Sequence, residues 1–189
     1  GVIAAEKPSR APAKPGELVS RIVSGLVLAA MALSLTWWSP WTFAALVLVG
    51  VAVLGYEWSS VTRGAYLDAG ALAHIALAVV VTALSAAGQP ILALIGLLIA
   101  AAVVVVLGLG GSGAIMAAGY LYVGLPALAL VWLRFDGAGF GWLAVLYVFL
   151  VVWTTDTAAY AVGRLVGGPK LAPRISPGKT WSGFAGGTA

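Results

Sequence analysis

Six long apolar runs constrain the fold of this chain more than any other feature. They cover residues 22–38, 41–56, 69–87, 91–109, 114–133 and 140 to about 161. A helix needs roughly 20 such residues to cross a bilayer, and irregular backbone is not tolerated against lipid. The runs also lack the alternation of barrel strands. We therefore predict an all-α, polytopic transmembrane helix bundle with about six spans. The first two runs are short, so a single membrane hairpin is the alternative for them.

The composition excludes most other classes of protein. Hydrophobic residues make up 62% of the chain and charged residues 8%, whereas a soluble domain carries about 25% charged residues. Both a soluble globular domain and a disordered chain are therefore excluded. The sequence has no cysteine and one histidine, His74, which excludes disulfides and thiolate or histidine metal clusters. We interpret His74 as a neutral imidazole near the interface or paired within the bundle.

The basic residues predict an orientation in the membrane. Residues 1–20 are polar and rich in proline, which indicates a flexible basic arm before the bundle at residues 21–161. With the arm in the cytoplasm, nine of the ten Lys and Arg residues lie inside and only Arg134 lies outside, as the positive-inside rule requires. We expect a multi-pass protein of the cell inner (plasma) membrane, with no nucleic-acid partner. Arg134 and Asp136 are interpreted as a solvated boundary.

Two glycine patterns resemble nucleotide-binding motifs without their structural context. Gly108, Gly110 and Gly113 spell G-x-G-x-x-G, but apolar runs of membrane length flank them where a strand and a βαβ unit are required. We interpret them as a turn between helices. Residues 178–180 end like a Walker A loop, but Pro173 stands where the first glycine is required. We therefore predict no P-loop.

A polar face is predicted at the end of the sixth run. If that helix continues, Asp156, Tyr160, Gly163 and Arg164 are spaced at i, i+4, i+7 and i+8, which places them on one face. An ionisable residue in the membrane costs about 2.5–3.5 kcal/mol and normally faces a protein interior or a water-filled cavity. The face either neutralises charges on neighbouring helices or forms one wall of an anion or metal site.

Basic residues and prolines alternate after this face. Gly167-Gly168-Pro169 breaks the helix, and residues 162–182 are predicted to form a cytoplasmic substrate-binding loop, with a plain charged loop as the alternative. Ser176-Pro177 is typical of an N-cap followed by the first helical residue, which predicts a new helix and a phosphate site with Lys179. Residues 183–189, with Gly183 and Gly187 spaced for close packing, predict the start of a further span that is cut short.

Residues 156–183 resemble the central motif of the phosphatidate cytidylyltransferases, the CDP-diacylglycerol synthases. The shared pattern is D-T-x-A-Y, then G-R, then K-L-A-P-x-I-S-P-x-K-T. Weaker likeness extends to Tyr56-Glu57-Trp58 and to residues 122–126. The resemblance implies a nucleotidyltransferase of phospholipid biosynthesis that joins phosphatidate to CTP with Mg²⁺, giving CDP-diacylglycerol and pyrophosphate.

The resemblance also implies roles for individual residues. The implied catalytic residues are Asp156 and Lys179, and Asp156 is the implied metal ligand. The implied substrate-binding residues are Tyr160, Arg164, Lys170, Arg174, Ser176 and Thr180. The expected partners are CTP, phosphatidate and the lipid bilayer, and a homodimer stays open.

The sequence departs from the family pattern in one respect. Family members continue with further spans and a second signature, K-D-x-x-x-x-x-P-G-H-G-G-x-x-D-R-x-D, whereas no Asp or Glu follows Asp156 here. We expect a fragment of the enzyme that is inactive alone, with other metal ligands beyond Ala189. A transporter of anionic lipid and a non-catalytic membrane module are the alternative functions.

Overall fold

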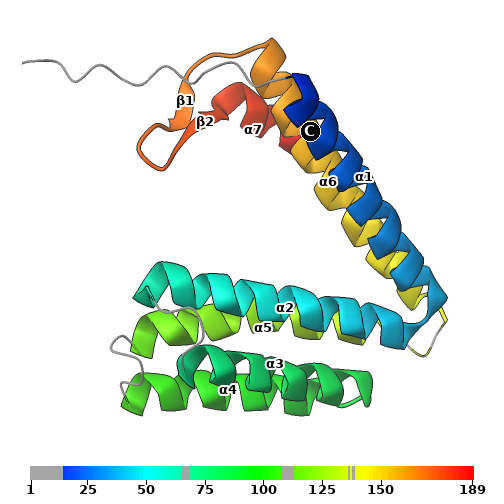
Figure 1. Ribbon diagram of the computed structural model, residues 1–189, viewed down its shortest axis with the longest axis vertical. Coiled ribbons are helices and arrows are strands. Elements are labelled where there is room, and N and C mark those ends of the chain that lie inside the picture. Colours follow the sequence, from blue (N-terminus) through cyan, green and yellow to red (C-terminus); the bar gives the residue numbers. More distant parts are fainter. Residues whose placement is uncertain (1–14, 65–68, 108–112, 136, 138) are drawn as a thin grey trace, which may run out of the picture.

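The computed structural model describes residues 15–64, 69–107, 113–135, 137 and 139–189. Six of its helices follow one another along the chain (Figure 1): α1 (Pro15–Trp38), α2 (Pro40–Arg63), α3 (Ala69–Ala86), α4 (Pro90–Leu107), α5 (Gly113–Arg134) and α6 (Gly141–Leu165). A two-stranded hairpin, β1 (Lys170–Ala172) and β2 (Ser176–Thr180), then leads into α7 (Trp181–Thr188). Each predicted apolar run therefore forms a helix.

The lengths of the helices confirm an all-α, polytopic membrane bundle. By length and composition, four described helices can cross a membrane: α2, α3, α5 and α6. The apolar parts of α1 and α4, Ile22–Trp38 and Pro90–Val106, are shorter. The first helix begins at Pro15, within the segment predicted as an arm, because proline fits the first turn of a helix. Residues 1–14 lie outside the described residues.

The first two runs form separate helices with a defined turn between them. Ser39 has extended backbone, and its Oγ accepts a hydrogen bond from the Trp41 amide at 3.1 Å. Pro40 occupies the first helical position, where its missing amide hydrogen costs nothing. The helix ends at Arg63, and its C-cap Gly64 has a φ of 66° and donates its amide to the Ser60 carbonyl. These N-cap and C-cap groups define α2 as a helix of its own.

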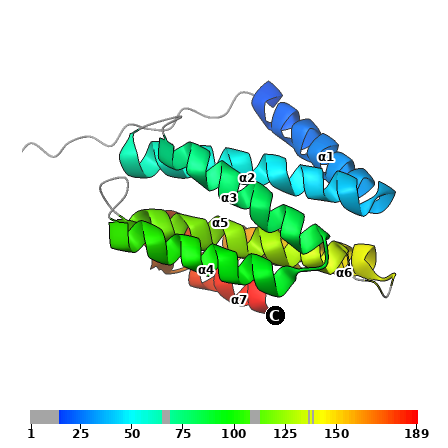
Figure 2. The same ribbon diagram turned by 90° about the horizontal axis from the view of Figure 1, so that it is seen from below.

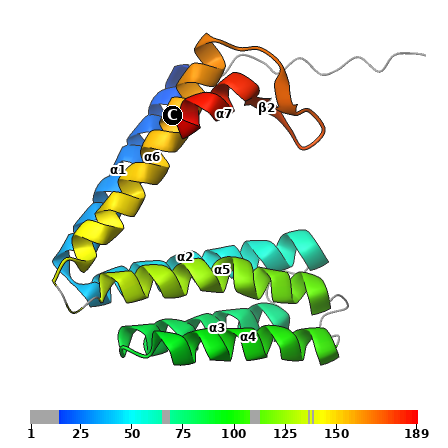
Figure 3. The ribbon, with the colours of Figure 1, turned by 180° about the vertical axis from the view of Figure 1, so that it is seen from behind.

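The helices form two groups that diverge from one end. Figures 1, 2 and 3 show α2, α3, α4 and α5 running together, whereas α1 and α6 lead away from the end at which α1 meets α2 and α5 meets α6. The four-helix group contains the core, which includes Val81, Leu97, Val104 and Tyr120. In contrast, Gly141 and Val145 are the buried residues of α6, so most of its apolar surface is open to lipid.

His74 is buried in the four-helix group, where its ring lies edge-on to Tyr120 with the centroids 4.8 Å apart. The prediction of an imidazole paired within the bundle is therefore confirmed. Of the predicted glycine turn, Gly113 begins α5. Gly108 and Gly110 lie outside the described residues.

Arg134 occupies the turn at which the two groups join, and the prediction that it is solvated is wrong. Its side chain is 8% exposed, and Nε donates to the carbonyl of Thr36 at 2.8 Å. Thr36 lies in the last turn of α1, where carbonyls have no partner within the helix. The arginine is buried because it satisfies such a carbonyl. Asp136, predicted as its solvated neighbour, lies outside the described residues.

The helix predicted from Ser176 is also wrong. Ser176 and Pro177 belong to β2, which pairs antiparallel with β1 so that Ala172 lies opposite Ser176 and Lys170 opposite Thr180. Pairing with β1 gives the backbone an extended partner that local capping preferences do not encode, and proline is tolerated in an edge strand. The helix begins five residues later, at Trp181.

A candidate phosphate-binding active site

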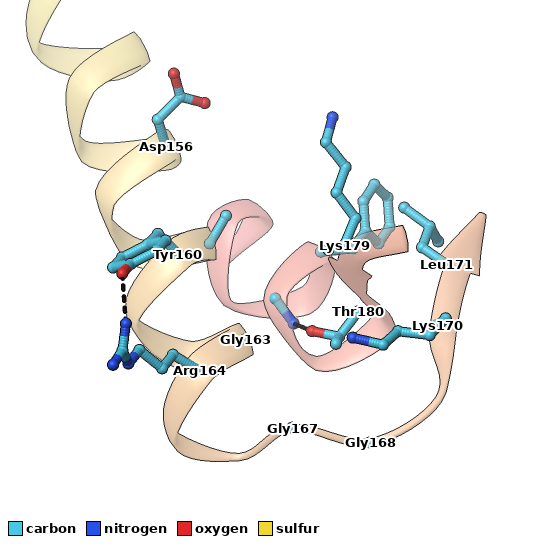
Figure 4. Close-up of a pocket in the computed structure, with 14 residues that line it drawn as sticks. Asp156, Tyr160, Gly163, Arg164, Gly167, Gly168, Lys170, Leu171, Lys179 and Thr180 are labelled. Carbon is cyan, nitrogen blue, oxygen red and sulfur yellow. Dashed lines mark hydrogen bonds between the residues drawn. The ribbon is translucent and has the colours of Figure 1, made fainter. Parts of the chain in front are cut away.

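The site is built on one face of α6. Because α6 continues to Leu165, Asp156, Tyr160, Gly163 and Arg164 share the face that their spacing predicts. Figure 4 shows the three longer side chains along this part of the helix, and Nη1 of Arg164 donates to the hydroxyl of Tyr160 at 2.9 Å. The face therefore presents the Asp156 carboxylate farther from the end of α6 and the Arg164 guanidinium close to that end.

A second wall comes from α7, which lies directly against α6. A Cβ atom on Gly183 would lie 2.7 Å from the carbonyl oxygen of Ala159, and one on Gly187 would lie 2.9 Å from the Cβ of Ala159. Neither approach leaves room for a side chain. The prediction that Gly183 and Gly187 form a close packing face is therefore confirmed.

Thr180 fixes the start of α7. Its Oγ1 accepts a hydrogen bond from the Gly183 amide at 3.1 Å and lies 3.0 Å from Oγ of Ser182, with which it shares a second hydrogen bond. Ser182 in turn donates to the carbonyl of Gly167. The N-cap of this helix is therefore Thr180, and not Ser176 as the sequence predicted. These bonds hold the end of α6, the end of β2 and the start of α7 together.

The third wall is the hairpin, and the three walls enclose a cavity of about 750 Å³. The cationic side chains that line it are Arg164, Lys170 and Lys179, and Asp156 is the one carboxylate among its lining residues. Figure 4 shows Asp156 and Lys179 extending from opposite sides, one from α6 and the other from β2. Three cations against one anion give the described lining a positive balance, which favours an anionic ligand.

The cavity also has an apolar side, which the sequence did not predict as part of the site. Leu171 and Phe184 line it, from β1 and α7. Leu171 follows Lys170 in β1, and Phe184 follows Gly183 in α7. That these two side chains line the cavity cannot be predicted without the positions of the hairpin and α7. The pocket is therefore amphipathic, with basic groups beside apolar ones.

Six of the eight predicted site residues line this cavity, and two do not. The six are Asp156, Tyr160, Arg164, Lys170, Lys179 and Thr180. Arg174 is exposed in the turn between the strands, and Ser176 is half-buried in β2, and neither is among the lining residues. Strand pairing separates them from the cavity, because it carries the tip of the hairpin away from its base.

The residues that line the cavity include one carboxylate that could bind Mg²⁺, that of Asp156. Among the described residues there is no group of three or more His, Cys, Asp or Glu side chains that could hold a metal. A Mg²⁺ ion in a phosphoryl-transfer site commonly uses one or two carboxylates and takes further ligands from substrate phosphates and water. Asp156 can serve as one such carboxylate ligand. It does not by itself form a metal site made of protein ligands alone.

The fold and the cavity together define a multi-pass membrane protein with a cationic, amphipathic pocket at one end of its helices. The chain belongs to the cytidylyltransferase family, whose sequence model matches residues 19–189. This match includes every residue that lines the cavity.

Individual relatives carry one common name. The phosphatidate cytidylyltransferase of Brucella suis biovar 1 (strain 1330) is 39% identical over 174 residues, which cover 91% of this chain and 64% of that protein. The protein of the same name from Staphylococcus haemolyticus (strain JCSC1435) is 52% identical over 66 residues, 35% of this chain and 24% of that protein. The chain thus spans 64% of the length of the Brucella relative. No solved structure matches.

Proposed function

We propose that the protein carrying this chain is a phosphatidate cytidylyltransferase, which transfers CMP from CTP to phosphatidate. The observation that carries the proposal is the cationic cavity, built from the residues of the family motif on a helix that is otherwise open to lipid. Its relatives bear the name of this enzyme. A cavity of about 750 Å³ also lies within the roughly 300–1,000 Å³ usual for small-molecule sites.

The proposed reaction is a displacement at phosphorus. A phosphate oxygen of phosphatidate attacks the α-phosphorus of CTP, the bond from that phosphorus to the bridging β-oxygen breaks, and pyrophosphate leaves with the electron pair. The protein's part is to position the groups and to neutralise their oxygens. We assign phosphate binding to Lys179, Lys170 and Arg164, and a supporting hydrogen bond to Tyr160.

Asp156 is proposed as a catalytic residue that holds Mg²⁺ together with substrate phosphate oxygens. When bound, the ion supplies positive charge that stabilises the oxygens of the transferring group. Thr180 is proposed to act on the substrate site by fixing the hairpin end, since its Oγ1 is engaged in capping α7.

The amphipathic lining suggests how a lipid and a nucleotide share one cavity. Leu171 and Phe184 would contact the glycerol end of phosphatidate, which enters sideways from the bilayer, whereas CTP arrives from water. Figure 1 shows the start of α1 and the end of α6 at the same end of these two helices, which supports the proposal that the start of α1 and the cavity lie on one side of the membrane. From the distribution of Lys and Arg, we propose that this side is cytoplasmic and that the membrane is the inner (plasma) membrane.

A homodimer is part of the same proposal. Among its described residues α6 buries only Gly141 and Val145, so its remaining surface is accessible to a second copy as well as to lipid. Light scattering of the purified protein in detergent measures the mass of the assembly. A monomeric mass at all protein concentrations would contradict the dimer without affecting the proposed reaction.

The test of the reaction is CTP-dependent formation of CDP-diacylglycerol by the full-length protein in lipid vesicles, with pyrophosphate measured in parallel. We expect Lys179→Ala and Asp156→Asn to lower kcat/KM at least tenfold, because a lost hydrogen bond to a charged group is worth about 1.5–3 kcal/mol. Gly50→Ala, on an exposed part of α2 with nothing near its added Cβ, is the control. Lipid movement without pyrophosphate release would support a transporter and overturn the enzyme.

A further inference from the structure

We propose that the tip of the β1–β2 hairpin, residues 173–175, docks into the headgroup layer of the bilayer that the helices cross. In this arrangement Ile175 enters the interface and Arg174 contacts anionic lipid phosphates. The inference concerns a membrane contact outside the cavity, and it does not depend on the proposed reaction.

The length of α6 sets the depth at which the hairpin begins. The helix has 25 residues, which is about 37 Å at 1.5 Å per residue, against a hydrocarbon core of about 30 Å. Its end therefore reaches the headgroup region. Leu165 is 85% exposed and Val166 is 71% exposed at this end. Apolar side chains in such positions favour a boundary with lipid over open water.

The direction of the hairpin keeps it at that depth. Figures 1 and 3 show β1, β2 and their connecting turn leaving to one side of α6, not continuing along its axis. The base of the hairpin is fixed in this direction, because the Trp181 amide donates to the Pro169 carbonyl at 3.1 Å and Ser182 donates to Gly167. With the axis of α6 taken as the direction across the bilayer, a hairpin that leaves sideways from the headgroup level runs along the membrane surface.

The chemistry of the tip matches a lipid interface. Ile175 is 89% exposed, although a hydrogen bond from its amide to the Ala172 carbonyl at 3.1 Å holds the turn in a defined shape. A single exposed isoleucine is ordinary, but this one lies beside Arg174, which is exposed and does not line the cavity. An apolar side chain next to a guanidinium is suited to the boundary between acyl chains and phosphates.

Charge complementarity identifies the lipid as anionic. Residues 157–189 contain four basic side chains, Arg164, Lys170, Arg174 and Lys179, and no acidic one. A basic residue near an anionic membrane surface contributes about 1 kcal/mol of attraction. Three of the four line the cavity, which leaves Arg174 to interact with the surface. Trp181, 55% exposed at the same end, is of the residue type that anchors proteins at this level.

The absence of cysteine from the chain allows a direct test. Ile175→Cys, in the full-length protein with any cysteine outside residues 1–189 replaced by serine, is labelled with a fluorophore and reconstituted in phosphatidylethanolamine–phosphatidylglycerol vesicles. We expect a lipid carrying a nitroxide at its headgroup to quench the label at least twofold more than aqueous iodide does. Adding Arg174→Glu should reduce the lipid quenching at least twofold. The matched control, Lys179→Glu, makes the same charge change at the cavity end of β2 and should leave it unchanged.

Three results would overturn the proposal. Strong quenching by iodide with none by the nitroxide lipid would place the tip in water. Protection from both quenchers would place it against protein, either this chain or a second copy. Equal losses of lipid quenching with Arg174→Glu and Lys179→Glu would show that Arg174 makes no specific contact with the lipid. Because Ile175 and Arg174 are exposed, a normal circular-dichroism spectrum is expected for both variants and shows that a changed signal does not come from unfolding.

Discussion

Thr180 joins three parts of the candidate site through one side chain. Its oxygen caps α7, its hydroxyl bonds with Ser182, and its position in β2 places Lys179 beside the cavity. The residue is buried, so the bonds are shielded from water and cannot be replaced by it. Its importance therefore comes from geometry and does not require contact with substrate.

We predict that Thr180→Val and Thr180→Ser will differ. Valine keeps the shape but removes the acceptor for the Gly183 amide, which costs about 1 kcal/mol for an N-cap. We expect a lower free energy of unfolding and a several-fold higher KM for CTP. Serine retains the oxygen and should stay close to the wild type in both measurements. If valine and serine behave alike, the cap has no role in the site.

At the residue level, the sequence predicted most of the cavity but not its edge. The face from Asp156 to Arg164 follows from helical spacing alone, and Lys170 and Lys179 follow from the motif. Arg174 and Ser176 belong to the same motif, yet the hairpin places them away from the cavity. Distance along a chain indicates proximity within a helix, but not across a hairpin whose register is unknown.

Among the elements, α6 and α7 are in close contact because glycines leave room between them. The backbone of Gly183 faces the Ala159 carbonyl. Gly163 faces Thr180, and a Cβ atom added to Gly163 would lie 3.0 Å from Oγ1 of Thr180. Small residues at helix contacts in membranes allow close van der Waals packing, since lipid provides no hydrophobic drive for association. The position of α7, and with it one wall of the cavity, rests on this contact.

We predict that Gly183→Ala will displace α7 from α6. The new methyl group would lie 2.7 Å from the Ala159 carbonyl oxygen, a backbone atom that cannot move aside alone. Overpacking of this kind costs about 1–3 kcal/mol, so the Tm in detergent should fall and CTP binding should weaken. Gly50→Ala, which meets no atom within 4 Å, should keep or raise the Tm, because alanine is the better helix former. Equal Tm values for the two variants would contradict the close contact.

The existence of the helices could be predicted because membrane-length apolar runs have few alternative structures. The ends of the elements were less predictable. Ser176-Pro177 has the local signature of a helix start, and the long-range pairing of β2 with β1 overrides it. Local capping rules describe what a segment prefers alone, and here a partner strand supplies stronger hydrogen bonds.

For the molecule as a whole, the arrangement of the helices could not be predicted. In an ordinary amphipathic helix the apolar stripe indicates which face is buried. These helices are apolar on nearly every face, so the sequence does not indicate which neighbours they contact. The arrangement of the four-helix group relative to α1 and α6 depends on packing and on polar contacts such as the bonds from Arg134 and Thr42 to carbonyls of α1.

We predict that Arg134→Ala will destabilise the junction of the two groups. Loss of the bond to the Thr36 carbonyl leaves a helix-end acceptor unsatisfied, at a cost of about 1.5–3 kcal/mol for a bond to a charged donor. Chemical denaturation in micelles, followed by circular dichroism, measures this free energy. Arg164→Ala makes the same change at an exposed position and should alter the unfolding free energy by less than about 0.5 kcal/mol. Equal effects would show that burial of Arg134 adds no stability.

Because α6 extends far from the junction at Arg134, a small tilt of α6 there produces a larger movement at its other end. The helix is held at its first turns and carries the cavity at its far end, about 37 Å away by its length of 25 residues. A tilt of about 5° at the junction would therefore move the cavity end by about 3 Å, the length of a hydrogen bond. A small disturbance on the far side of the membrane would thus be enlarged into a movement of the whole cavity, because its lining residues all lie between Asp156 and Phe184 and move with α6.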